Sequence, residues 1–103
     1  MFLGCPKRNH DAAIYVSDGS IMVSLWATKE QPSNPFSKDK NVGLHHVAFQ
    51  VENEADLNSI YTRLINSGVP IEFAPELQGK GPAKHMMFYE PSGIRVEFIW
   101  LGI

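Results

Sequence analysis

One amphipathic segment, flanked on both sides by strand-like segments, constrains the fold more than any other feature of this sequence. Its apolar residues recur at helical spacing and form a single stripe: Leu57, Ile60, Tyr61, Leu64 and Ile65. Asn53 is a good N-cap with Asp56 at the capping-box position, and Gly68 is placed to end the helix. Because such a stripe must be buried against another element, we expect the helix to pack on a sheet built from its neighbours.

The strand that precedes the helix, residues 44–51, alternates between two faces. One face carries His46, Ala48 and Gln50, and the other carries His45, Val47, Phe49 and Val51. Residues 69–74, 85–89 and 94–100 are predicted to be further strands, separated by a glycine-rich loop (75–84) and a turn (90–93). The order over residues 44–100 is therefore β-α-β-β-β, and the expected fold class is α+β.

The N-terminal part predicts a β-hairpin and then a linker. Residues 11–16 and 21–27 alternate like strands, and Asp18-Gly19 between them is a strong turn signal. Residues 31–43 contain two prolines, two serines and alternating charges, which is typical of a linker.

A shift of 73 residues superposes this hairpin on the last one and places Ser24 over Glu97. We therefore interpret residues 11–27 as the second half of an incomplete first module and residues 44–100 as a complete βαβββ module. Both are expected within a single domain spanning residues 1–103.

Charge and cysteine content narrow the function classes. The net charge is −2 without a basic patch, so we expect neither nucleic acid nor an anionic membrane as a partner. No stretch approaches the roughly 20 apolar residues that span a bilayer. Cys5 is the only cysteine and cannot form a disulfide within the chain, which favours a cytoplasmic protein.

Two segments carry a resemblance to a known family: residues 45–51 (HHVAFQV) and residues 85–98 (HMMFYEPSGIRVEF). They resemble the vicinal oxygen chelate superfamily of glyoxalases, bleomycin-resistance proteins and type I extradiol dioxygenases. The resemblance implies paired βαβββ modules that form an open cup, with His46 and Glu97 as metal ligands. Tyr89 and Glu97 occupy the positions implied to act in catalysis. Imidazole and carboxylate together suit a divalent ion such as Fe, Mn, Ni or Zn.

The same cup is the expected small-molecule site. The residues expected to line it and contact a ligand are Ser24, Trp26, Gln50, Met87 and Arg95. His85 is expected at a loop edge, with a hydrogen bond to a metal ligand as the alternative. For Glu97, the alternative to metal ligation is a cross-strand pair with a basic group.

Three functions stay open at this point. The first is a metal-dependent lyase or dioxygenase acting on vicinal oxygens, and the second is a metal-free binder of drug-like molecules that uses Trp26, Phe88 and Tyr89. The third is an interaction module without a small-molecule site. The incomplete first module leaves too few ligands in one chain. Either the cup binds no metal or, as we expect, a homodimer forms in which two copies share their His46 and Glu97 residues.

Overall fold

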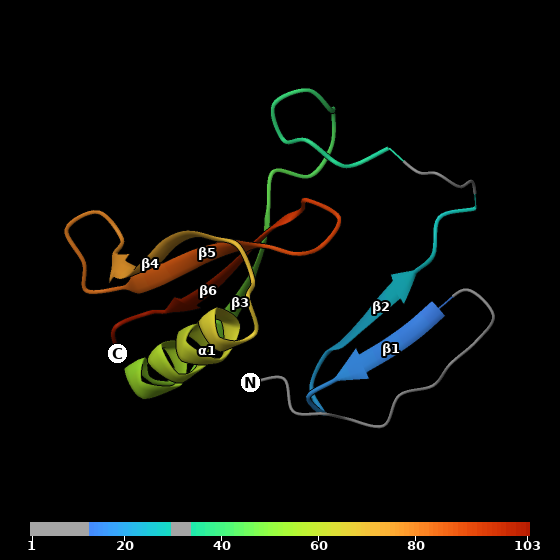
Figure 1. Cartoon of the computed structure of the whole chain (residues 1–103). Coiled ribbons are helices and arrows are strands. Elements are labelled where there is room, and N and C mark those ends of the chain that lie inside the picture. The colour runs from blue at the N-terminus through green and yellow to red at the C-terminus, as the bar shows by residue number, and fades with distance from the viewer. Residues whose placement is uncertain (1–12, 30–33) are drawn as a thin grey trace. The chain divides into compact units, whose positions relative to one another are not determined.

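The computed structural model describes residues 13–29 and 34–103 (Figure 1). The chain divides into two compact units, residues 1–34 and residues 35–103, and the division falls within the predicted linker. Cys5, the first two residues of the strand predicted at 11–16 and residues 31–33 of the linker lie outside the described residues.

The first unit contains the predicted hairpin. Strand β1 (Ala13–Ser17) pairs antiparallel with β2 (Met22–Trp26). The Asp18 carboxylate closes the turn by accepting hydrogen bonds from the backbone N–H groups of Ser20 (2.8 Å) and Ile21 (3.0 Å). Gly19 supplies the positive φ of 97° that this turn requires.

The second unit confirms the β-α-β-β-β order. It consists of β3 (Val47–Val51), α1 (Glu54–Asn66), β4 (Ile71–Leu77), β5 (Lys84–Tyr89) and β6 (Arg95–Trp100). The sheet order is β3-β6-β5-β4, with β3 parallel to β6 and the other pairs antiparallel. The observed architecture, a βαβββ module plus a hairpin, is the predicted α+β fold.

Helix α1 begins and ends where the sequence indicates. The Asn53 side chain accepts a hydrogen bond from the backbone N–H of Asp56 at 2.8 Å, which makes it a true N-cap. At the other end, Gly68 has a φ of 74°, and the N–H groups of Gly68 and Val69 bond back to the carbonyls of Ile65 and Leu64. This arrangement is a Schellman motif, which glycine permits because it lacks a Cβ atom.

The core lies between α1 and one face of the sheet. Leu57 and Ile60 from the helix are buried there, and the sheet contributes Val51, Met86, Val96 and Phe98. The ring of Phe98 contacts the rings of Phe49 and Phe88. Burial of each of these large apolar side chains contributes about 1.5–3 kcal/mol, so this layer holds the module together.

Several strand boundaries differ from the prediction, and the largest differences are in β3 and β4. Strand β3 starts at Val47, so His45 and His46 precede the strand rather than lie within it. Strand β4 continues through Pro75 to Leu77, with register shifts on both sides of Phe73. Because β4 is an edge strand, a proline without an N–H group is compatible with this position.

Candidate functional site

One surface of the sheet, opposite the core around Phe98, carries Tyr89, Arg95 and Glu97. We call this surface the polar face. Strand register brings these residues together, because Tyr89 pairs with Arg95 while Glu97 pairs with Met87 on one side and Ala48 on the other. Residues paired in register point to the same side of a sheet. Glu97 therefore lies at the centre of this face, between β3 and β5.

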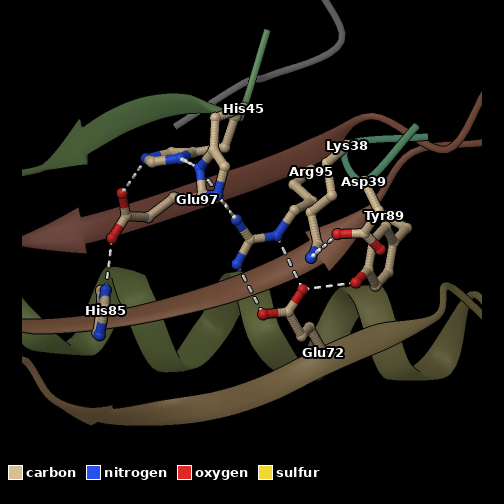
Figure 2. Close-up of polar contacts among 9 residues, drawn as sticks. Lys38, Asp39, His45, Glu72, His85, Tyr89, Arg95 and Glu97 are labelled. Atoms are coloured by element: carbon tan, nitrogen blue, oxygen red, sulfur yellow. Dashed lines mark hydrogen bonds and ion pairs between the residues drawn. The ribbon is translucent and has the colours of Figure 1, made fainter. Parts of the chain in front are cut away.

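The Glu97 carboxylate lies between two imidazoles (Figure 2). Its Oε1 is 3.3 Å from Nε2 of His46, and its Oε2 accepts a hydrogen bond from Nδ1 of His85. The residue is only 6% exposed, so these contacts replace much of its hydration. Glu97 thus meets both the predicted metal ligand and a basic partner from the neighbouring strand.

The two adjacent histidines are linked to Arg95. Nδ1 of His45 is 2.8 Å from Nδ1 of His46, and Nη1 of Arg95 lies 3.2 Å from both ring nitrogens of His45. A guanidinium only donates, so the His45 nitrogen that it contacts must accept. When that nitrogen is Nδ1, His46 must donate from its own Nδ1, and a neutral His46 then has its lone pair on Nε2, next to Glu97.

Arg95 and Tyr89 both bind Glu72, a residue that the sequence analysis did not select. Nε and Nη2 of Arg95 donate to the two carboxylate oxygens of Glu72 at 2.8 and 2.7 Å, and the Tyr89 hydroxyl donates to Oε1 at 2.5 Å (Figure 2). The hydrogen bonds from Arg95 and then Tyr89 lower the pKa of Glu72 to about 2. The same bond raises the pKa of Tyr89, because ionised phenolate next to a carboxylate is unfavourable.

A signal for Glu72 was present in the sequence. It is the only charged residue in the strand predicted at 69–74. In an alternating strand it lies on the opposite face from its apolar neighbours Ile71 and Phe73. Its partner could not be predicted, because the register shift between Ile71 and Phe73 brings both Glu72 and Phe73 towards the polar face.

The remaining predicted ligand-binding residues fall into two groups. Met87 is buried beside Glu97, and Gln50 is exposed on β3 opposite Ile99. Ser24 and Trp26 belong to β2 of the first unit, where Trp26 is 64% exposed and its ring meets that of Tyr15 edge-on at 6.4 Å. The second unit alone therefore brings together His46, Met87, Tyr89, Arg95 and Glu97.

The donor types at this site fit a divalent ion, but the number of donors is small. His46 and Glu97 offer an imidazole nitrogen and a carboxylate oxygen side by side, a combination typical of first-row metals. His85 approaches the other oxygen of Glu97, so the two histidines flank the carboxylate rather than converge. Within residues 13–29 and 34–103, no group of three or more His, Cys, Asp or Glu side chains is arranged to hold a metal. In the same residues, no helix has the length and hydropathy needed to cross a bilayer.

Comparisons with solved structures show the same fold. A glyoxalase/bleomycin resistance protein/dioxygenase from Alicyclobacillus acidocaldarius matches with a TM-score of 0.71 and 14% identity, over 96% of this chain and 74% of that one. A domain of the same description from a Frankia species gives a TM-score of 0.73 and 19% identity, over 93% of this chain and 75% of that one. Lactoylglutathione lyase from Agrobacterium tumefaciens gives a TM-score of 0.62 and 20% identity, over 90% of this chain and 71% of that one.

The family is shown by the sequence itself. No curated protein matches the chain at a significant level. The sequence profile of one superfamily, however, matches residues 5–98, which is most of the chain and includes the hairpin and the βαβββ module up to the middle of β6. The chain therefore belongs to the Glyoxalase/Bleomycin resistance protein/Dioxygenase superfamily.

Proposed function

We propose that this protein is a divalent-metal-dependent enzyme that acts on a small substrate with two adjacent oxygens, as a lyase or a dioxygenase. The observation that carries the proposal is the 3.3 Å contact between Nε2 of His46 and Oε1 of Glu97. Two electron-pair donors at this separation attract each other only when a proton or a cation lies between them. The contact is therefore a position for a proton or a cation, and it is formed by the two residues that the family resemblance assigns to metal binding.

A bound Fe, Mn, Ni or Zn ion would supply Lewis acidity to the substrate oxygens. The chain's own residues define what surrounds those oxygens. Tyr89 stays protonated because its hydroxyl donates a hydrogen bond to the carboxylate of Glu72, so its oxygen is left to accept a hydrogen bond from the substrate. Arg95 is held by Glu72 on the same face, and Met87 provides an apolar surface next to Glu97.

The ligand set is completed by a second copy of the chain in this proposal. Each copy contributes His46 and Glu97, so a homodimer offers four protein ligands of the kind that the family uses. Apolar exposure in the hairpin supports association: Met22 is 64% exposed, Leu25 53% and Trp26 64%. A two-stranded hairpin is marginal by itself and gains stability from such contact. We place this dimer in the cytoplasm, consistent with the single cysteine.

The test combines mass and metal content. Wild-type protein, His46→Ala and Glu97→Gln would be separated by size exclusion with light scattering, and each peak would be analysed for transition metals. The proposal predicts a metal-loaded wild-type dimer and loss of metal in both variants. A wild-type protein that takes up no Fe, Mn, Ni or Zn on reconstitution would end the enzyme proposal.

The second candidate function is a metal-free binder of small aromatic or cationic molecules. It is favoured by the exposed Trp26 with its edge-on contact to Tyr15, and by the lack of a three-ligand group in the described part of the chain. Thermal stabilisation by such ligands in the presence of a chelator, lost in Trp26→Ala, would support this function over the first.

A further inference from the structure

His85 and Glu97 are diagonal neighbours on β5 and β6, since His85 pairs in register with Ile99 and Glu97 with Met87. The bond from Nδ1 of His85 occupies Oε2 of Glu97. The His85 side chain is only 16% exposed, and the ring of Phe73 lies against it with a centroid separation of 4.8 Å. A ring packed in this way has little freedom to turn, so the direction of its Nδ1–H bond is fixed.

We propose that His85 is a positioning residue: by holding Oε2 of Glu97, it directs Oε1 towards His46 and so shapes the metal site. This inference rests on the proposed function, and it adds a residue for which the family resemblance assigns no role. A carboxylate only accepts hydrogen bonds, so the proton of this contact is on Nδ1 of His85. The two histidines thus divide the carboxylate between them, one oxygen each.

The division of oxygens excludes a simpler reading in which His85 is itself a ligand of the same ion. Its Nδ1 faces Oε2, whereas Nε2 of His46 faces Oε1. Partners that orient a ligating carboxylate from behind alter metal affinity by about 10–100-fold when they are removed. We expect a loss in this range when His85 can no longer donate.

The test uses Co(II) alone as the probe, with binding followed by calorimetry and by visible absorption. His85→Phe keeps a packed ring against Phe73 but removes the donor, and we expect about 10–100-fold weaker Co(II) binding and a changed spectrum. His85→Asn places an amide N–H where Nδ1–H was and should restore most of the affinity. Lys84→Met is the matched control, because Lys84 is the adjacent residue of β5 and binds Glu54 of α1 at 2.5 Å. It should bind Co(II) like the wild type.

Equal Co(II) affinity and spectra for wild type and His85→Phe would overturn the inference. So would equal weakening in His85→Phe and His85→Asn, since the lost bond would then not be the cause. If the wild type itself binds no Co(II), the proposed function fails, and nitrogen-detected NMR of the histidine rings in the metal-free protein decides the inference separately. A protonated Nδ1 on His85 that shifts in Glu97→Gln supports it, and an unprotonated Nδ1 or an unshifted signal overturns it.

Discussion

At the scale of single residues, Glu72 links Tyr89, a predicted catalytic residue, to Arg95, a predicted ligand-binding residue. It accepts from Arg95 through both oxygens and from the Tyr89 hydroxyl, and its side chain is 28% exposed. Arg95 is only 8% exposed, so removal of the carboxylate would leave a nearly buried cation without its main partner. Glu72 therefore affects both stability and the protonation of Tyr89.

For Glu72→Gln we expect the pKa of Tyr89 to fall towards its ordinary value, because the carboxylate that disfavours the phenolate is gone. The unfolding free energy should fall by about 1–2 kcal/mol, as a partly exposed charge-assisted bond is lost. NMR titration of the tyrosine rings and urea unfolding measure the two effects. Glu76→Gln on the same strand, where the residue is exposed, is the control. An unchanged Tyr89 titration in Glu72→Gln would contradict the bond.

The pH dependence of stability provides a second prediction at this scale. The pKa of Glu72 is about 2 in the folded chain, held down by Arg95, against an ordinary value of 4.5. A lowered folded pKa means that its contribution is complete above pH 4.5 and is lost as the pH falls towards 2. The difference in unfolding free energy between wild type and Glu72→Gln should therefore shrink across this window. A difference that stays constant from pH 6 to about pH 2 would show that ionised Glu72 does not stabilise the fold.

At the scale of elements, features set by neighbouring residues in the sequence could be predicted. Features set by how one strand pairs with another could not. Alternation, the Asn53 cap and the Gly68 terminator locate the helix and strands because each acts within a few neighbouring residues. The extension of β4 through Pro75 and the shift next to Phe73 depend on which strand lies at the edge and how it meets β5. His46 and Glu97 were selected from the sequence by family resemblance. The role of Glu72 could be recognised only once the register between β4 and β5 was known.

The β5–β6 turn provides a prediction at the element scale. The backbone N–H of Phe36 donates to the Ser92 carbonyl at 3.1 Å, so the segment after residue 34 is bonded to this turn. A Cβ atom on Gly93 would stand 2.7 Å from the Phe36 carbonyl oxygen, and Gly93 has a φ of 92°. Gly93→Ala should therefore combine backbone strain with a clash.

Gly79→Ala is the matched control, because Gly79 also has a positive φ, 60°, but a Cβ atom there would meet nothing within 4 Å. We expect Gly79→Ala to cost about 1 kcal/mol and Gly93→Ala at least about 1 kcal/mol more, measured by urea unfolding. Equal costs for the two substitutions would show that the contact with Phe36 does not constrain the turn.

At the scale of the whole molecule, the proposed function requires two copies of the chain to associate. The βαβββ unit has its own core, whereas the described part of the hairpin unit exposes most of its apolar side chains. One chain brings His46 and Glu97 together but offers no group of three metal-binding side chains among its described residues. Metal binding and dimerisation are therefore expected to be coupled, since each dimer would complete the site and each ion would hold the dimer.

This coupling predicts how thermal stability responds to metal and to dilution. A ligand that binds only the folded dimer adds about 2.7 kcal/mol when its free concentration is 100 times its dissociation constant. The melting temperature of the wild type should therefore rise with added Ni(II) and with protein concentration. A chelator should reverse the rise that Ni(II) causes. His46→Ala should melt like the metal-free wild type and gain nothing from Ni(II), because it removes a partly exposed ligand that precedes β3 without opening the core. A similar Ni(II) response in both proteins would place metal binding elsewhere on the chain, and a melting temperature independent of protein concentration would argue for a monomer.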